Sequence, residues 1–156
     1  MYKQILVPVD GSETANKALR AALELAKDSG GRVRMIHVIE ELAYASGYEQ
    51  FGAYTEDLLN AMQEAGKKIL QDAMTRAQSA GVEADNLLFD SVSGRLAEVV
   101  ATAAREWNAD LIVVGTHGRR GVGRMLLGSG AEQIIRLAPV PVLVIRSDAE
   151  SSTKSA

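Results

Sequence analysis

The sequence predicts an α/β fold in which a parallel sheet carries helices on both faces. Five short apolar segments typical of buried strands alternate with four segments of helical periodicity along the 156 residues. The chain is long enough for one sizeable core, and hydrophobic residues make up 47% of it. A glycine-rich stretch lies between the fourth strand and the last helix. We therefore expect one doubly wound domain over residues 1–147 and a polar, frayed tail over residues 148–156.

The first strand and the first helix open the domain. Residues 5–9 are apolar, and Pro8 near their end indicates that the backbone there is not fully paired in the sheet. The turn at residues 10–12 leads into a helix, which Gly30 and Gly31 end. The predicted core face of this helix carries Ala15, Ala18, Leu19, Ala22, Leu25 and Ala26.

A long irregular segment separates the second strand from the second helix. The strand is expected over residues 32–40 and the helix over residues 55–80. Residues 41–54 have no clean period and contain the aromatics Tyr44, Tyr48, Phe51 and Tyr54. Such a loop can be a lid or a partner surface, but its aromatics can also pack on their own helix, and we favour packing. The predicted core stripe of the long helix is Leu58, Met62, Ala65, Ile69, Ala73 and Ala77.

The remaining elements alternate in the same way. Residues 86–92 predict a third strand, and a turn at residues 93–95 leads into a helix. The inward residues of that helix are expected to be Leu96, Val99, Val100, Ala103 and Trp107. The fourth strand covers residues 111–114. The last helix covers residues 130–138, and a fifth strand follows over residues 142–145.

Residues 115–129 predict a phosphate-binding loop. Their spacing is Gly115, two residues, Gly118, nine residues, then Gly128 and Ser129. A buried strand precedes the loop, and residues 129–132 predict a capping box that opens a helix. Glycine lets an anion approach backbone N–H groups, and a helix N-terminus attracts negative charge. Neither a Walker loop nor the dinucleotide fingerprint fits this spacing.

The charge of this loop also suits a polyphosphate. The whole chain has a formal net charge of −3, but the loop is locally positive. Its three arginines are Arg119, Arg120 and Arg124.

Composition argues against several classes of function. The chain contains no Cys, which rules out disulfides, thiol catalysis and Cys-based zinc sites. No apolar run reaches transmembrane length, and the N-terminus lacks a signal-peptide pattern. The mild acidity argues against nucleic-acid binding. We therefore expect a cytoplasmic protein without a membrane span.

These motifs together resemble the universal stress protein family, in its ATP-binding branch. The loop matches the family's nucleotide loop at every glycine and at Ser129, and residues 5–12, 35–38, 93–94 and 138–145 resemble its other signatures. The resemblance implies a Rossmann-like domain of the adenine nucleotide alpha hydrolase-like type, with strand order 3-2-1-4-5. It also implies a homodimer, which would cover an apolar sheet edge. The pairing strand would be Val142, Leu143, Val144 and Ile145.

The resemblance further implies a nucleotide site for ATP, ADP or AMP, with Mg²⁺ carried on the phosphates and no metal site made by the protein. The implied binding residues are Pro8, Val9, Asp10, Val38, Gly115, Gly118, Arg119, Gly128, Ser129 and Gly130. Asp10 would lie at the ribose or adenine, Pro8 and Val9 would line the base pocket, and the backbone of Val38 would read the adenine edge. The others would contact phosphate and ribose. From the residues alone, Asp10 can also be a helix cap and Val38 a core residue.

Three functions remain open at this point. The chain can be a regulatory nucleotide-binding module that acts in the stress response through a homodimer and a protein or transporter partner. It can be a slow ATPase or self-phosphorylating enzyme, or a structural dimer without nucleotide. The loop offers only His117 and Ser129 as catalytic candidates, and Ser129 is expected to be a cap. We therefore favour binding, with at most weak ATP hydrolysis.

The two histidines and two of the glycines carry further expectations. His37 is interpreted as a satisfied histidine of the sheet rather than a ligand, and His117 as a loop residue with a structural hydrogen bond. A bulky side chain at Gly115 or Gly128 is expected to block phosphate while leaving the fold largely intact.

Overall fold

The computed structural model describes residues 1–39, 56–90, 94–116 and 127–146. Within these ranges a five-stranded parallel sheet has the order β3-β2-β1-β4-β5. This confirms the predicted doubly wound sheet and its strand order. The strands are β1 (Gln4–Pro8), β2 (Arg32–Val38), β3 (Glu83–Phe89), β4 (Leu111–Gly115) and β5 (Val142–Ile145). The helices are α1 (Glu13–Ser29), α3 (Glu56–Ala80), α4 (Leu96–Trp107) and α5 (Ser129–Leu137).

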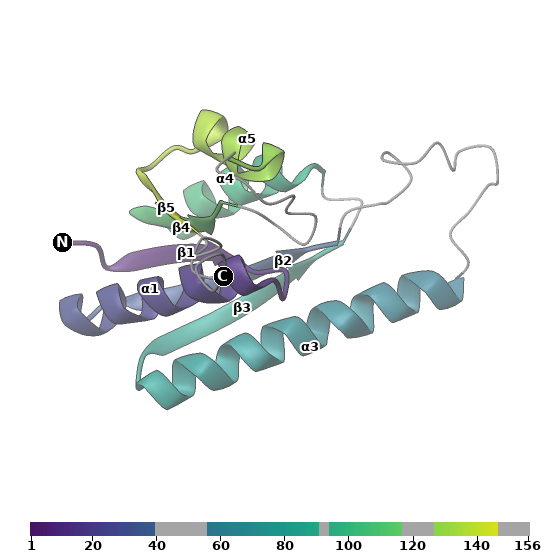
Figure 1. Ribbon diagram of the computed structural model, residues 1–156, viewed down its shortest axis with the longest axis horizontal. Helices are drawn as coiled ribbons and strands as arrows, with labels where there is room; N and C mark the ends of the chain where they lie inside the picture. The colour runs from purple at the N-terminus through teal and green to yellow at the C-terminus, as the bar shows by residue number, and fades with distance from the viewer. Residues whose placement is uncertain (40–55, 91–93, 117–126, 147–156) are drawn as a thin grey trace, which may run out of the picture.

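Helices cover both faces of the sheet. Figure 1 shows α1 and α3 on one side and α4 and α5 on the other. Side chains alternate between the two faces along a strand. In β1, Ile5 and Val7 therefore join the core under α1 and α3, whereas Leu6 joins the core under α4 and α5. All three are completely buried, so the central strands are fixed from both sides.

Helix α1 begins and ends with hydrogen bonds that its sequence supplies. The Ser12 hydroxyl accepts a hydrogen bond from the Ala15 N–H at 3.2 Å, which caps the helix N-terminus. Gly30 adopts a left-handed conformation at φ 66° and ends the helix, as predicted. Of the predicted core face, Leu25 is only half-buried, and Leu23 is buried instead. The cap places the first turn of α1 directly after the end of β1.

Helix α3 is longer than the sheet it covers. Its buried residues begin only at Gly66 and continue with Leu70, Ala73 and Ala77. The predicted stripe is therefore right for Ala73 and Ala77 but wrong at Leu58, which is 41% exposed, and at Ala65. The reason is visible in Figure 1, where the N-terminal end of α3 reaches past the carboxyl ends of the strands. A periodic stripe cannot reveal how far the sheet beneath it extends.

Strand β3 starts earlier than the sequence predicts. The sequence predicts a strand over residues 86–92, but β3 pairs with β2 from Glu83 to Phe89. Strand β3 lies at the edge of the sheet, so its first residues can be polar. The sequence therefore lacks the apolar run that would predict the start of the strand. Asp85 there forms a two-pronged ion pair with Arg34 of β2, with both distances 2.7 Å. In the parts of the chain that the structure describes, no helix has the length and apolar character to cross a membrane.

Candidate functional site

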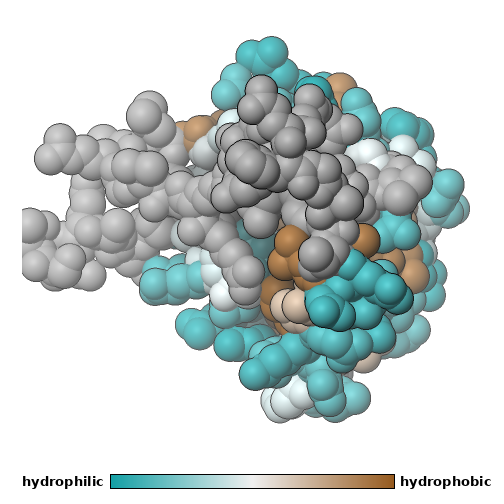
Figure 2. All heavy atoms as spheres, turned by 90° about the vertical axis from the view of Figure 1, so that its right-hand side faces the viewer, coloured by the Kyte–Doolittle hydropathy of each residue, from teal (hydrophilic) through white to brown (hydrophobic). Residues whose placement is uncertain are grey.

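The sheet opens between β1 and β4 at its carboxyl end. Strand β1 pairs with β2 up to Pro8, but its pairing with β4 ends at Leu6 opposite Ile112. Strand β4 continues to Gly115 beyond that last pair. The order of strands reverses between β1 and β4, and open α/β sheets bind ligands at such a point. Figure 2 looks onto this side of the molecule, where hydrophobic surface lies beside hydrophilic groups.

The end of β1 presents a carboxylate at this opening. Asp10 is half-buried, and its Oδ1 accepts a hydrogen bond from the Ser12 N–H at 2.9 Å. This Asx turn joins β1 to α1 and holds the carboxylate beside the N-terminus of that helix. Ser12, rather than Asp10, caps α1. The capping explanation for Asp10 is therefore wrong, although the residue does shape the turn.

The end of β2 leaves backbone groups facing the opening. Ile39 N–H donates to Phe89 O on β3 at 2.8 Å, so the neighbouring N–H and C=O of Val38 face the β1 side. The β1–β2 pairing ends before them, and no described residue bonds either group. The Val38 side chain is 8% exposed and belongs to the core, as the residue alone suggested. Its main chain is the part that faces outward to the site.

His37 makes a hydrogen bond to the end of β1. Its Nδ1 lies 2.7 Å from the carbonyl oxygen of Val9, and because a carbonyl can only accept, Nδ1 is the donor. The interpretation of His37 as a satisfied histidine of the sheet is confirmed. Its partner, however, is the same Val9 that the sequence predicts in the base pocket.

Gly115 is required by packing as well as by its place in the loop. A Cβ at this position would lie 2.8 Å from the carbonyl carbon and 2.9 Å from the carbonyl oxygen of Thr14, in the first turn of α1. Backbone atoms at that distance cannot yield without a shift of the helix. The expectation that a side chain at Gly115 leaves the fold largely intact is therefore wrong. No sequence motif indicated this close packing of Gly115 on Thr14.

Helix α5 points its N-terminus into the same region. Gly128 is its N-cap residue, and the Gly128 N–H donates to Thr116 O at 2.7 Å. Ser129 is the first helical residue and makes no side-chain cap, so the predicted capping box is wrong. Glu132 N–H instead donates to the Gly128 carbonyl at 3.0 Å. The Ser129 side chain is exposed and not engaged by the helix.

Gly130 follows in the first turn of α5. A Cβ there would meet only Leu96 Cδ2 of α4, at 3.4 Å. Its missing side chain would therefore point to α4, and an alanine fits. The Gly130 N–H belongs to the first turn of the helix, where backbone donors lack helical partners.

Thr116 contributes a buried hydroxyl at the junction of β4 and the loop. Its backbone N–H donates to Ile145 O at 2.9 Å, which ties the junction to β5. The residue is 8% exposed, and its Oγ1 has no hydrogen-bond partner in the structure as described. Buried hydroxyls are normally paired, so this oxygen is suited to a ligand or water at the site. Within the sequence, a polar residue directly after an apolar strand was the available signal.

The structure thus brings together eight of the ten predicted site residues. Pro8, Val9, Asp10 and Val38 lie at the ends of β1 and β2, and the other four lie at the end of β4 and the start of α5. Those four are Gly115, Gly128, Ser129 and Gly130. Gly118 and Arg119 lie outside the described residues, as do His117 and the segment 41–54.

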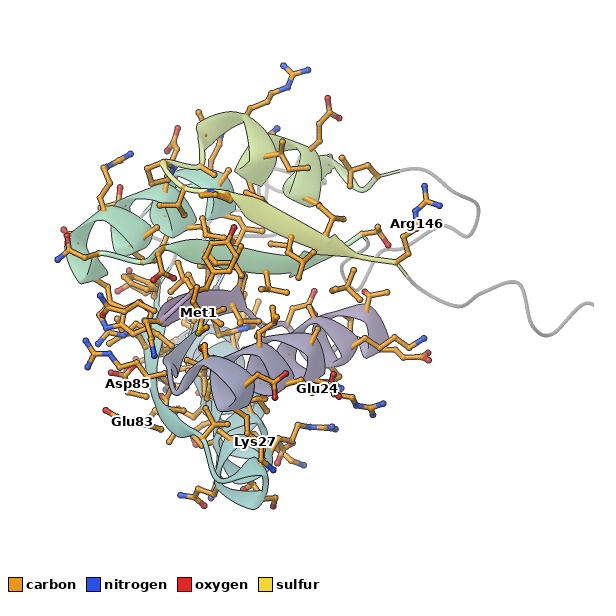
Figure 3. The ribbon with its side chains drawn as sticks, turned by 90° about the vertical axis from the view of Figure 1, so that its left-hand side faces the viewer. Met1, Glu24, Lys27, Glu83, Asp85 and Arg146 are labelled. Carbon is orange, nitrogen blue, oxygen red and sulfur yellow. The ribbon has the colours of Figure 1, made fainter. Side chains whose placement is uncertain are left out.

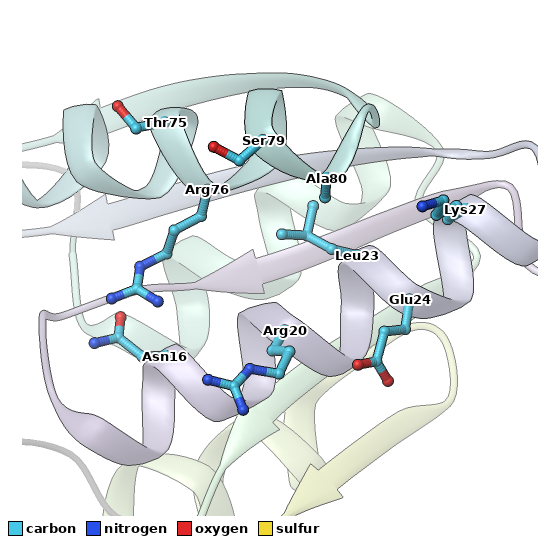
Figure 4. A pocket seen from close by; sticks show the side chains of 9 residues that line it. All are labelled: Asn16, Arg20, Leu23, Glu24, Lys27, Thr75, Arg76, Ser79 and Ala80. Carbon is cyan, nitrogen blue, oxygen red and sulfur yellow. The ribbon is translucent and has the colours of Figure 1, made fainter.

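A separate groove of about 420 Å³ lies between α1 and α3. In Figure 4 Arg76 points from α3 toward Asn16 of α1, with Arg20 and Glu24 further along α1. Its walls are the sides of helices rather than the ends of strands, and no predicted site residue lines it. It is therefore not the site that the glycine motif predicts.

Comparisons with known proteins agree with this fold. The universal stress protein family model matches residues 1–146. Universal stress protein YxiE of Bacillus subtilis is 32% identical, with 94% of this chain and 100% of that protein aligned. A crystal structure of a family protein from Burkholderia pseudomallei is 38% identical with a TM-score of 0.75, covering 94% of this chain and 97% of that one.

A third comparison concerns a nucleotide complex. The universal stress protein from Archaeoglobus fulgidus in complex with dAMP is 25% identical with a TM-score of 0.68, covering 92% of this chain and 98% of that one. The family model spans nearly the whole chain, and solved structures of family proteins share its fold. The chain belongs to the universal stress protein family.

Proposed function

We propose that this protein is a regulatory module that binds an adenine nucleotide, ATP in the first place, at the opening between β1 and β4. The observation that carries the proposal is the shared position of two elements. The strand-order reversal leaves an opening, and the N-terminus of α5 with its glycines lies at the same end of the sheet. A family relative of known structure holds dAMP.

Each part of the nucleotide has a counterpart among the described residues. The N–H and C=O of Val38 offer a donor and an acceptor to the adenine edge, beside Pro8 and Val9. The Asp10 carboxylate can accept hydrogen bonds from ribose hydroxyls. Phosphates would lie at Gly115 and at the first turn of α5 with Gly128, Ser129 and Gly130. Gly118 and Arg119 complete the proposed set from the sequence. Mg²⁺ would be held by phosphate oxygens.

One observation favours the alternative of slow ATP hydrolysis or self-phosphorylation. Ser129 does not cap α5, so its hydroxyl is not committed to the helix, contrary to what the sequence indicated. We still favour binding, because phosphoryl transfer needs a positioned nucleophile together with charge stabilisation. A single-turnover assay of the wild type and of S129A and H117A variants separates the two. If the wild type hydrolyses ATP no faster than buffer does, the protein is not an ATPase.

The proposed site is tested by thermal unfolding of nucleotide-free protein titrated with ATP, ADP and AMP, each with and without Mg²⁺. A ligand that binds only the folded protein adds about 2.7 kcal/mol at a hundred times its dissociation constant, a rise in Tm of roughly 5–10 °C. Saturable stabilisation by ATP is the expected result. If none of these nucleotides raises the Tm, the structural dimer without nucleotide becomes the favoured function.

A variant at Gly128 gives this titration its control. Gly128 has φ −60° and ψ 152°, a conformation open to any residue, so G128V should block phosphate without backbone strain. G130A is the matched variant, since its Cβ would face α4. ATP should stabilise G130A much more than G128V. Equal stabilisation of both would show that the phosphates lie elsewhere.

A further inference from the structure

The bond from His37 to Val9 takes the place of a regular bond of the sheet. Val9 N–H donates to Ile36 O at 2.8 Å, which continues the β1–β2 ladder past Pro8. In a regular parallel ladder the next bond would run from Val38 N–H to Val9 O. That bond is absent from the described backbone, and the pairing ends at Pro8 opposite Ile36. Instead, the Val9 carbonyl oxygen accepts a hydrogen bond from the imidazole Nδ1 of His37, at 2.7 Å.

The consequence is an unpaired N–H on Val38. A carbonyl that already accepts a short hydrogen bond from a side chain is a weaker target for the neighbouring backbone donor. The Val38 N–H therefore remains available at the site beside the Val38 C=O, although the residue itself is buried. Unpaired backbone groups at the end of a central strand are costly unless a ligand or water pairs with them.

Helix α3 provides the space that the imidazole needs. Gly66 of α3 is buried, and a Cβ there would lie 2.8 Å from His37 Cδ2 and 2.8 Å from Leu88 Cδ1. Glycine inside a helix costs about 0.5–1 kcal/mol relative to alanine. Space for the His37 ring and the Leu88 side chain gives a reason for this glycine in the middle of a 25-residue helix.

We propose that His37 is a positioning residue for base recognition: by holding the Val9 carbonyl, it keeps the Val38 backbone open for the edge of an adenine ring. This rests on the proposed nucleotide function. Adenine carries an amino donor at position 6, where guanine carries a carbonyl acceptor. A fixed backbone donor and acceptor can therefore distinguish the two bases. His37 acts through Val9 and Val38 and does not itself touch the base.

The proposal predicts what happens when the imidazole is removed. In H37L the Val38 N–H is free to pair with Val9 O, so the ladder extends by one bond and the base loses a partner. ATP should bind about fivefold to tenfold more weakly, and the preference for ATP over GTP should shrink. Inorganic tripolyphosphate, which has no base, should bind as in the wild type. H37N, whose amide can donate from near the position of Nδ1, should restore much of the preference.

Two measurements decide the outcome. Calorimetric titrations of the wild type, H37L and H37N with ATP, GTP and tripolyphosphate give the affinities, and amide exchange by NMR follows Val38 N–H in the ligand-free proteins. We expect that amide to be protected in H37L and not in the wild type. If H37L binds ATP as tightly as the wild type and keeps the same preference for ATP over GTP, the proposed role of His37 is wrong. If H37L binds tripolyphosphate as much more weakly as it binds ATP, the substitution has damaged the whole site, and the proposed role in base recognition is also wrong.

Failure of the nucleotide function gives a different result. If the wild type binds no adenine nucleotide, the proposed function fails and base recognition by Val38 fails with it. If the wild type binds ATP and H37L binds it equally well, only the role of His37 fails. G66A is a second variant in case H37L does not fold, because its Cβ would crowd the same ring from α3. It should reduce the ATP preference in the same direction, and an unchanged preference would count against the proposal.

Discussion

Two glycines of the candidate site, Gly115 and Gly130, differ in what surrounds them. At Gly115 a Cβ would be 2.8 Å from backbone of Thr14, whereas at Gly130 it would lie 3.4 Å from the flexible end of Leu96. We predict that G115A lowers the free energy of unfolding by about 1–3 kcal/mol, because α1 must shift to admit the methyl group. G130A should be neutral or slightly stabilising, since alanine favours a helix over glycine.

Urea unfolding followed by circular dichroism measures both variants under the same conditions. The two substitutions add the same methyl group, so the difference between them reports the contact with Thr14 together with the helix preference of alanine at position 130. Equal unfolding midpoints for G115A and the wild type would mean that α1 does not pack on Gly115 as described. Two glycines that look alike in the sequence are therefore expected to differ: Gly115 is required by packing, and Gly130 tolerates a side chain.

At the scale of elements, an arginine joins β2, β3 and α4 at the amino-terminal side of the sheet. Arg34 pairs with both carboxylate oxygens of Asp85 and lies 4.7 Å from the centre of the Trp107 ring. Figure 3 looks from this side and shows Asp85 and Glu83 along β3. The hydrogen bond to Asp85 raises the pKa of Arg34, burial opposes the rise, and the charge of Asp85 adds to it.

We predict that R34K lowers the free energy of unfolding by roughly 0.5–1 kcal/mol, because lysine keeps the charge but loses the planar two-pronged bond and the stacking. A raised arginine pKa stabilises the fold below that pKa and is lost only as pH rises through it. The contribution from Arg34 titration should therefore be constant across the neutral range. Unfolding in urea at several pH values, at low and high salt, measures this.

R32K is the matched control. Arg32 stacks on the same ring at 5.3 Å and donates to Gln4 Oε1 at 2.6 Å, but its contact with Glu83 is 4.0 Å and its side chain is 46% exposed. Its replacement should cost less than that of Arg34. A larger loss for R32K would contradict the leading role of the pair between Arg34 and Asp85.

The elements differ in how well the sequence predicts them, for identifiable reasons. Strands β1 and β4 are buried on both faces, so their apolar runs predict them closely. Strand β3 lies at an edge and begins with polar residues, so its start was misplaced. The stripe of α3 continues past the sheet and cannot show where burial stops. Local patterns report which face of an element is apolar, and the neighbouring elements decide how much of it is covered.

The candidate site was predictable to a similar extent. A glycine-rich stretch between a strand and a helix indicates a phosphate-binding loop, and the family resemblance implies roles in it for Gly115, Gly128 and Ser129. The contacts of Thr14 with Gly115, and of His37 with Val9, join residues far apart in the chain. No local pattern encodes such contacts. The capping box failed because Gly128, not Ser129, took the N-cap position.

At the scale of the whole molecule, β5 leaves one edge of the sheet open in the described chain. Ile112 N–H donates to Pro141 O and Thr116 N–H to Ile145 O, so the odd-numbered residues of β5 direct their backbone groups to β4. Val142 and Val144 therefore direct theirs outward, and Leu143 is 37% exposed. We propose that a second copy pairs with this edge, as the family resemblance implies.

The register makes the dimer testable without loss of the fold. V144P removes an outward N–H and no bond to β4, and proline is tolerated at such an edge position. L143P removes a donor that faces β4 and should destabilise the sheet itself. We predict that the wild type sediments with twice the chain mass of 16.7 kDa and that V144P sediments as a folded monomer. Analytical ultracentrifugation with circular dichroism as the folding check measures both. A V144P protein that stays dimeric would place the interface away from the outward edge of β5, and a monomeric wild type would remove the dimer altogether.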